Sequence, residues 1–334
     1  MVTVAGIDCG TNSIRLMIAR VDENGMHIVL PRIMRVVRLG EGVDVNHAFS
    51  QAALERVYAA IDEFADLLAR YQVDALRFVA TSATRDARNR EDFENYVHEH
   101  LGVWPDVISG EEEARLSFLG ATSVAGIDQY EAPFLVVDLG GGSTELVLGG
   151  TQAEKLHVQA AYSMAVGSVR MSERYRLDDA PSIEAIEAAT KDIDEHIEQA
   201  ASVVPLDAVR TIIGVSGTVT TMSAVCLGQK EYRVEEVDGA VLSIDAVDEV
   251  NQRVLRMTRQ QRDTLSVVHP GRRDVIGAGA LVWSCVLAAV QTAAATRDIR
   301  IDSYIASEHG LLDGIVRDLG QRMQHADRAV HEQS

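Results

Sequence analysis

The chain has 334 residues, of which 47% are hydrophobic and 24% charged, as expected for a globular protein long enough to form two domains. Its formal net charge of −19 disfavours nonspecific binding to nucleic acid or to an anionic membrane, so we expect neither as a partner. The three cysteines, Cys9, Cys226 and Cys285, fit neither a disulfide framework nor a metal-ligand spacing, which indicates a cytoplasmic, reducing location.

The first predicted element is a hairpin with a loop suited to phosphate. An apolar run leads into Asp8, the small residues Gly10–Ser13 follow, and a second apolar run extends to Ala19. Two short apolar runs around such a turn are typical of paired buried strands. Backbone N–H groups clustered in the turn can bind an anion. The charges of Asp8 and Arg15 inside this apolar region are unlike a secretory signal peptide.

The rest of the first half alternates between extended and helical segments. Residues 26–39 are expected to be extended, and a helix is expected from Ser50 to Arg70, because apolar residues recur there at helical spacing. A strand at 76–80 precedes the cluster Thr81–Arg88. This cluster suits either a phosphate site at a helix start or an ordinary helix cap.

Three glutamates begin the next predicted helix, and helical spacing separates their roles. Acidic residues at a helix N-terminus are favoured by the helix dipole, which explains most such runs. Glu111, however, lies four residues before Arg115 on a solvated face, whereas Glu113 shares a face with Leu116 and Gly120. A carboxylate at the edge of the packed side would be partly desolvated and its pKa raised, as a general base requires.

The second half opens with a stretch that repeats the first hairpin. An apolar run ends at Asp138, the turn Gly140–Thr144 follows, and a second apolar run begins after Glu145. The three glycines of the turn let backbone N–H groups approach a ligand closely. A carboxylate beside phosphates usually indicates a divalent cation between them. A structural hairpin is the alternative, but the repetition favours two similar lobes facing a cleft.

Later segments predict a helix at 182–201 and a strand at 210–215, followed by the turn Ser216–Thr221, a third candidate phosphate loop. The uncharged segment Val275–Thr296 could span a bilayer by its length, but its many alanines favour a helix buried in a large core. Arg272 lies just before this helix. A cation there is unfavourable for the helix dipole, which makes an anion-binding role worth considering.

The chain is expected to divide into three parts. The first lobe spans 1–125 and the second 126–306, with the hinge near Gly126. A C-terminal helix and a polar tail span 307–334. The helix is expected to pack back on the first lobe, and the tail to fray after Met323.

Four motifs resemble, in order, those of the exopolyphosphatase and guanosine pentaphosphate phosphohydrolase (Ppx/GppA) family. They are Thr81–Arg85, Ile108–Leu116, Asp138–Glu145 and Gly214–Thr218. The Ser-Gly-x-Glu-Glu-Ala-Arg element in the second is the most specific, because actins and sugar kinases lack it. The two glycine hairpins resemble the phosphate loops of the wider actin, Hsp70 and sugar-kinase superfamily.

The resemblance implies an α/β fold of two actin-like (ribonuclease H-like) domains with a cleft between them, and Mg²⁺-dependent hydrolysis of a terminal phosphoanhydride. Glu113 is implied to be the catalytic residue that positions and deprotonates the attacking water. Asp8, Asp138 and Glu145 are implied to contact the metal. Phosphate contacts are implied for Gly10, Thr11, Asn12, Ser13, Arg15, Arg85, Gly140, Gly141, Gly142, Ser143, Thr144 and Arg272, and Ser216, Gly217 and Thr218 join them as the third candidate loop.

Three activities fit this pattern. The favoured activity is that of an exopolyphosphatase acting on inorganic polyphosphate. A guanosine pentaphosphate (pppGpp) 5′-phosphohydrolase is the second, because it needs the same kind of binding site for a terminal phosphate. An actin-like ATPase or nucleotide-binding module is the third, although no long adenosine-binding insertion is visible. The resemblance also suggests a homodimer.

The chain departs from the longer members of the family at its C-terminal end. It stops at residue 334, without the HD-like helical region that helps those members hold long polymers, so we expect action on short chains. The closing Ser307–Gly314 segment also replaces the usual Gly-Leu-Arg-Glu-Gly, which removes one basic residue.

Overall fold

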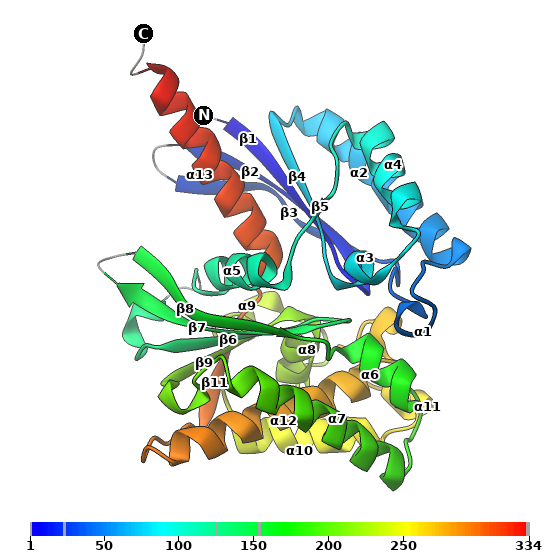
Figure 1. Ribbon diagram of the computed structural model, residues 1–334, viewed down its shortest axis with the longest axis vertical. Coiled ribbons are helices and arrows are strands. Elements are labelled where there is room, and N and C mark those ends of the chain that lie inside the picture. Colours follow the sequence, from blue (N-terminus) through cyan, green and yellow to red (C-terminus); the bar gives the residue numbers. More distant parts are fainter. Residues whose placement is uncertain (1, 23–24, 124–125, 153–154, 332–334) are drawn as a thin grey trace. The chain divides into compact units, whose positions relative to one another are not determined.

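The computed structural model describes residues 2–22, 25–123, 126–152 and 155–331 (Figure 1). The chain divides into two compact units. Unit 1 contains Met1–Gly120 and Leu311–Ser334, and unit 2 contains Ala121–Gly310. The domain limits expected from the sequence stay a prediction, since compactness alone does not show that each part folds independently.

Each unit contains one β-sheet, and the two sheets share a topology. In unit 1 the order is β3-β2-β1-β4-β5, with an antiparallel β1-β2-β3 meander and parallel pairing of β1 with β4 and of β4 with β5. The strands are β1 (Val2–Cys9), β2 (Ser13–Asp22), β3 (Gly25–Val36), β4 (Ala75–Ala80) and β5 (Asp106–Val107).

In unit 2 the order is β10-β11-β9-β6-β7-β8, again with an antiparallel meander, β6-β7-β8, followed by parallel strands β9 and β11. The strands are β6 (Phe134–Leu139), β7 (Thr144–Gln152), β8 (Lys155–Met164), β9 (Thr211–Val215), β10 (Val241–Ser243) and β11 (Ser303–Ala306). This duplicated α/β arrangement confirms the predicted fold class. The cleft that the resemblance implies stays a prediction.

Helices connect and cover the strands of both sheets. In unit 1 they are α1 (Val43–Asn46), α2 (Gln51–Tyr71), α3 (Ser82–Asp86), α4 (Arg90–Leu101), α5 (Gly110–Ala121) and α13 (Leu311–His331). In unit 2 they are α6 (Ser168–Tyr175), α7 (Ile183–Ala201), α8 (Ser216–Cys226), α9 (Val234–Val237), α10 (Ile244–Arg256), α11 (Arg259–Arg262), α12 (Ile276–Ala295) and three short 3-10 helices, Ile127–Gln129, Leu206–Ala208 and Pro270–Arg272.

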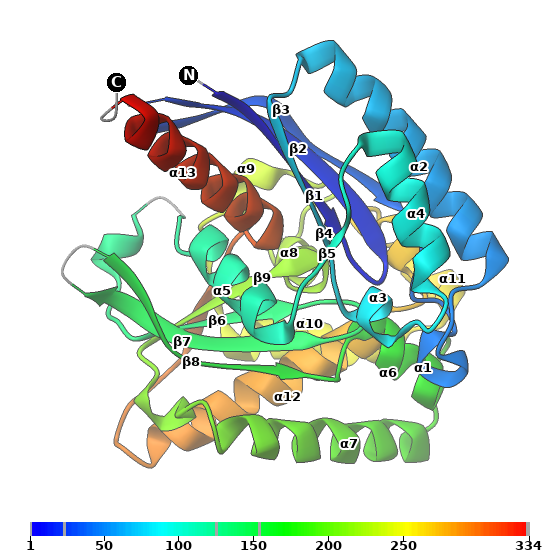
Figure 2. The ribbon, with the colours of Figure 1, turned by 45° about the horizontal axis from the view of Figure 1, so that its top comes forward.

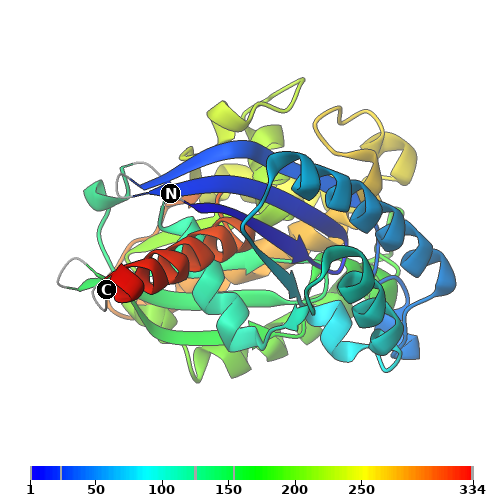
Figure 3. The ribbon, with the colours of Figure 1, turned by 90° about the horizontal axis from the view of Figure 1, so that it is seen from above.

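Alternate residues of β1 and β2 pack on opposite faces of the unit 1 sheet, as strand geometry requires. Ile7 and Leu16 belong to the core that α2 and α4 cover, whereas Val4 and Met17 pack against α13. Figures 2 and 3 show α2 and α4 on one side of these strands and α13 on the other. The sheet of unit 1 is therefore covered on both faces.

The C-terminal helix α13 packs very closely on unit 1. A Cβ atom on Gly6 of β1 would lie only 2.7 Å from Cγ2 of Val316, and one on Gly314 would overlap the carbonyl oxygen of Leu116 in α5. Glycine is needed at both positions for this approach. The helix continues to His331, and the fraying expected after Met323 stays a prediction.

The core of unit 2 lies between its sheet and the helices α7, α10 and α12. Of the described helices, α12 alone is long and apolar enough to cross a membrane by length and composition. Trp283, Leu287 and Val290 of this helix are buried in the core of unit 2, which is the placement predicted from its alanine content.

Candidate active site

The loop between β1 and β2 has the geometry of an anion-binding turn. It is closed by a hydrogen bond from Gly10 N to Ser13 O (3.0 Å). The carbonyl of Thr11 accepts from Gly40 N (2.8 Å), and that of Asn12 accepts from two N–H groups that follow β3 (3.1 and 2.9 Å). Because these carbonyls are turned toward the protein, an anion at the turn would meet N–H groups instead.

The loop between β6 and β7 repeats this construction in unit 2. Its closing bond runs from Gly140 N to Ser143 O (2.9 Å). The first N–H groups of α6 donate to the carbonyls of Gly140 (3.0 Å) and Gly141 (2.8 Å), and Nε of Arg170 donates to the carbonyl of Gly142 (2.8 Å). The carbonyls of all three glycines are thus bonded, which fixes the loop in one shape.

At the base of each loop an aspartate faces a charged residue on the neighbouring strand, and the sign of that charge differs between the two units. In unit 1, Asp8 pairs in register with Arg15, and their side chains form an ion pair of 3.2 Å. In unit 2 the same register pairs Asp138 with Glu145, and these two acids are only 8% and 1% exposed. Ser163 Oγ donates to Glu145 Oε1 (2.7 Å). Two acids at directly opposite positions repel one another, and a cation beside them relieves that repulsion.

These carboxylates fit a magnesium ion better than a transition metal. Among the residues that the structure describes, no group of three or more His, Cys, Asp or Glu side chains is arranged to hold a metal. Mg²⁺ does not need such a cage, because it usually takes one or two protein carboxylates and completes its shell with water and phosphate oxygens. Within unit 2, Asp138 and Glu145 form such a donor pair, whereas unit 1 has the single carboxylate of Asp8 at the matched position.

Glu113 is buried at the start of α5, as its spacing predicted. Ser109 caps this helix: its Oγ accepts from Glu112 N (3.3 Å) and its carbonyl from Glu113 N (3.0 Å). The Glu113 side chain, in a residue only 6% exposed, accepts from Nη1 of Arg85 at 2.8 Å. Arg85 thus holds this carboxylate in a charge-assisted hydrogen bond, which fixes its position in unit 1.

The cluster at the end of β4 does not serve merely as a helix cap. Thr81 stands at the N-cap position of α3, but its side chain makes no capping hydrogen bond. Arg85, in α3, donates to the carbonyl of Ile108 (2.8 Å) as well as to Glu113. Ala83 of α3 lies beside Gly40, which contacts Thr11 of the first loop. Within unit 1, α3 is therefore packed beside the loop between β1 and β2.

The three neighbouring glutamates have three different environments. Glu111 is exposed, whereas Glu113 is buried against Arg85. The prediction that Glu111 pairs with Arg115 is wrong, because Arg115 instead forms its ion pair with Glu112 (2.8 Å). That choice is favoured by Arg77, which also bonds to Glu112 (3.2 Å).

In unit 2, the predicted phosphate loop Ser216–Thr221 lies in contact with Arg272, which was also predicted to bind an anion. A Cβ atom on Gly217 would overlap the guanidinium of Arg272, so this side chain lies directly over the first turn of α8. Ser216 has a φ of 78°, in the left-handed region that disfavours residues other than glycine. Strained backbone of this kind is concentrated at functional sites. Thr218 is buried in the same turn.

The segment that carries Arg272 is held by a buried arginine. Arg262 is fully buried, and its guanidinium donates to five main-chain carbonyls. One of these belongs to Arg273 (3.1 Å). In the same segment, burial and the charges of Arg272 and Arg273 lower the pKa of His269.

The profile of the Ppx/GppA phosphatase family matches residues 17–319. The chain belongs to this family. The resemblance predicted from its motifs is thereby confirmed over nearly the whole sequence.

Individual members of the Ppx/GppA family agree with this assignment. Exopolyphosphatase 2 of Mycobacterium tuberculosis is 42% identical over 330 residues, which are 95% of this chain and 98% of that protein. A solved exopolyphosphatase-like protein is 58% identical with a TM-score of 0.94, covering 97% of this chain and 99% of the other. The Ppx/GppA protein of Aquifex aeolicus is 26% identical with a TM-score of 0.76, covering 96% and 98%.

Some residues that build the loops of this Ppx/GppA chain were missed in the sequence. Gly167 lies so close to the second loop that a Cβ atom there would stand 2.6 Å from Gly142 N. Arg170 binds the same loop through its Nε atom. Both residues follow the loop in the chain, at the start of α6, and nothing in the sequence around them indicates that they support it.

Proposed function

We propose that the protein is an exopolyphosphatase that hydrolyses the terminal phosphoanhydride of short inorganic polyphosphate and releases phosphate. One observation carries the proposal. Each unit has a loop closed by the same hydrogen bond, Gly10 N to Ser13 O and Gly140 N to Ser143 O, with a buried acid, Asp8 or Asp138, at its base. The similarity to exopolyphosphatase 2 over nearly the whole length of both chains supports the substrate.

The loops and the arginines are proposed to bind the phosphates. Backbone N–H groups of Gly10–Ser13 and Gly140–Thr144 would hold phosphate oxygens, as nests of amides do. Arg15 and Arg272 would neutralise charge along the chain. Such local positive groups are needed because the protein itself has a net charge of −19.

A magnesium ion is proposed as the cofactor. Asp138 and Glu145 would hold it, with Asp8 as a further carboxylate, because these are buried oxygen donors at the base of the loops. When bound, the ion would neutralise charge on the terminal phosphoryl group.

Glu113 is proposed as the general base. The oxygen of a water molecule attacks the terminal phosphorus, the bridging P–O bond breaks, and the proton of the water passes to the Glu113 carboxylate. Arg85 fixes that carboxylate through a 2.8 Å contact and would take part of the developing negative charge.

Three further features belong to the proposal. pppGpp carries a terminal phosphate of the same kind, so it is an alternative substrate. The family resemblance is the basis for a homodimer. The cysteine content is the basis for a cytoplasmic location.

The experiment is a parallel assay of phosphate release from tripolyphosphate, long-chain polyphosphate, pppGpp and ATP, with Mg²⁺ or with a chelator. We expect the highest kcat/KM on tripolyphosphate, and no release with the chelator. Release from ATP alone would contradict the proposal and would favour the actin-like ATPase instead. Preference for pppGpp would keep the mechanism and change the substrate.

A further inference from the structure

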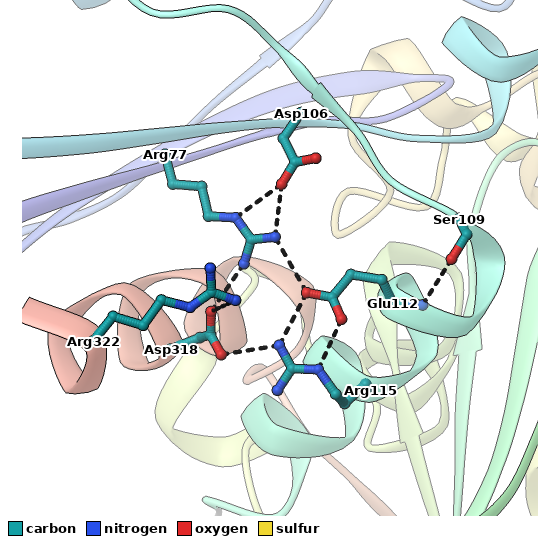
Figure 4. Close-up of polar contacts among 7 residues, drawn as sticks. All are labelled: Arg77, Asp106, Ser109, Glu112, Arg115, Asp318 and Arg322. Carbon is teal, nitrogen blue, oxygen red and sulfur yellow. Dashed lines mark hydrogen bonds and ion pairs between the residues drawn. The ribbon is translucent and has the colours of Figure 1, made fainter. Parts of the chain in front are cut away.

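An ion-pair network joins four elements of unit 1 (Figure 4), and one of its members, Glu112, directly precedes Glu113 in the chain. Arg77 of β4 bonds to Asp106 of β5 (2.7 Å), to Glu112 of α5 (3.2 Å) and to Asp318 of α13 (3.0 Å). Arg115, also in α5, bonds to Glu112 (2.8 Å) and to Asp318 (2.9 Å). The four residues Arg77, Glu112, Arg115 and Asp318 therefore form a closed ring of contacts, called here the α5 clamp.

The α5 clamp is more restrained than ordinary surface ion pairs. The side chains of Arg77 and Asp318 are only 11% and 10% exposed. Arg115 contacts Glu112 through two nitrogen atoms, Nε and Nη2, which gives the pair a fixed orientation. Ion-pair networks with such geometry hold side chains in place, whereas isolated exposed ion pairs contribute little to the stability of the fold.

The α5 clamp acts on the turn of helix that carries Glu113. Glu112 and Glu113 are adjacent in the first turn of α5, and their side chains reach different partners, the clamp and Arg85. The turn starts at Gly110, a flexible residue with low helix propensity. The clamp ties this turn to β4 on one side and to α13 on the other.

We propose that Arg77, Glu112, Arg115 and Asp318 are positioning residues for Glu113: the α5 clamp fixes the first turn of α5 so that the Glu113 carboxylate stays aligned with Arg85 and with the attacking water. The proposal rests on the function proposed above for Glu113. It assigns catalytic importance to a C-terminal helix whose residue Asp318 is 205 positions from Glu113 (318 − 113).

The physical reason is the sensitivity of proton transfer to geometry. A general base must stand within hydrogen-bond reach of the proton that it accepts. A misplacement of about 1 Å can cost roughly 100-fold in rate. Without the clamp, rotation or fraying of the first turn would move Glu113 by such amounts while its chemistry stays the same.

Three neighbouring substitutions of equal size test the proposal: Glu111→Gln, Glu112→Gln and Glu113→Gln, each assayed for kcat and KM on tripolyphosphate. We expect Glu113→Gln to reduce kcat by roughly 1,000-fold and Glu112→Gln by roughly 10- to 100-fold, with KM changed less than about threefold in both. Glu111→Gln, the matched control on the exposed side of the same turn, should keep wild-type kcat.

The double variant Glu112→Gln/Glu113→Gln separates positioning from general structural damage. If Glu112 acts through Glu113, its removal should cost less than about twofold once Glu113 is already replaced. A full additional loss of 10- to 100-fold would show that Glu112 acts independently of Glu113, which would overturn the proposal.

Amide hydrogen exchange of residues 110–116 gives a readout that does not need activity. In Glu112→Gln we expect exchange there to be at least about tenfold faster than in the wild type, whereas Glu111→Gln leaves it unchanged. Unchanged exchange and unchanged kcat in Glu112→Gln would overturn the proposal that the α5 clamp positions Glu113. An inactive wild type whose exchange still responds to Glu112→Gln would instead overturn the proposed function and leave the restraint on α5 standing.

Discussion

At the scale of single residues, the site depends on arginines that contact more than one group. Arg85 donates both to the Ile108 carbonyl and to Glu113, each at 2.8 Å. The guanidinium can do this because its donors are arranged in a rigid fork, whereas a lysine offers a point charge on a flexible stem. The identity of this residue is therefore expected to matter beyond its charge.

The prediction for Arg85 is that Arg85→Lys retains part of the activity and Arg85→Met very little. We expect kcat on tripolyphosphate to fall by roughly 10-fold in the first and by roughly 1,000-fold in the second, because the second also removes a charge that stabilises the transition state. Steady-state assays measure both values. Equal activity of Arg85→Lys and the wild type would mean that the fork geometry is not used.

His269 offers a probe of the proposed phosphate site near Arg272. Burial and the two neighbouring arginines lower the pKa of this imidazole, since they disfavour its charged form. A phosphate bound to Arg272 would offset the arginine charge and raise the pKa of His269. NMR titration of the Glu113→Gln variant, with and without tripolyphosphate, measures this shift.

The expected result is a higher pKa of His269 in the presence of tripolyphosphate. The control is Arg272→Met, in which the pKa should already be raised without substrate and should respond less to its addition. A pKa of His269 that does not change when tripolyphosphate saturates the Glu113→Gln variant would remove Arg272 from the phosphate-binding set.

At the scale of helices and strands, the pH dependence of stability reports the α5 clamp. The hydrogen bond from Arg115 is the largest cause that lowers the pKa of Glu112 to about 2, burial partly opposes it, and Arg77 adds to it. A carboxyl with a lowered folded-state pKa stabilises the fold above its unfolded value of 4.5, and this stabilisation is lost as the pH falls toward about 2.

We therefore predict that the difference in Tm between the wild type and Glu112→Gln is largest at pH 6 and shrinks steadily below about pH 4.5. Thermal unfolding followed at several pH values measures it. Arg322→Ala is a suitable comparison, because Arg322 contacts only Asp318 among the residues of Figure 4 and is 59% exposed. A difference in Tm that stays constant from pH 6 to pH 3 would contradict the statement that the ionised Glu112 carboxylate stabilises the α5 clamp.

The buried Arg262 makes a prediction about the stability of unit 2. Arg262→Met removes the donor to five main-chain carbonyls, three of them in buried hydrogen bonds, and each buried acceptor left unsatisfied costs about 1–3 kcal/mol, so we expect a loss of roughly 3 kcal/mol or more. Arg259→Ala, in the same short helix but 56% exposed, should cost less than about 0.5 kcal/mol. Urea denaturation of both variants compares them.

Sequence patterns predicted the elements well where the signal was local. Ser50 and Ser182 cap α2 and α7 through their side chains, as a cap followed by helical spacing requires. The contacts between distant segments were not predictable in this way. Arg77 and Asp318 are 241 residues apart, and nothing near either residue in the sequence indicates the other.

At the scale of the whole molecule, the two units share one strand arrangement and one loop construction but differ in charge. The repeated Asp-x-Gly pattern was sufficient to predict two similar lobes. The pattern was not sufficient to distinguish the roles of the two lobes, because the lobes differ in the residue that faces the aspartate on the neighbouring strand. Asp8 faces Arg15, and Asp138 faces Glu145. This contrast predicts that unit 2 is the unit that binds the metal.

Substitutions at the matched positions should therefore change stability in opposite directions when a chelator is present. Asp8→Asn leaves Arg15 without its carboxylate and should lower the stability of unit 1. Glu145→Gln removes the repulsion between two opposed acids and should raise the stability of unit 2 by up to about 1 kcal/mol. With Mg²⁺ and substrate the same Glu145→Gln should raise the Mg²⁺ concentration for half-maximal rate by roughly tenfold, since one oxygen ligand has lost its charge. If Glu145→Gln lowered stability in chelator and left the Mg²⁺ requirement unchanged, Glu145 would be a structural residue held by Ser163, and metal binding in unit 2 would depend on Asp138 alone.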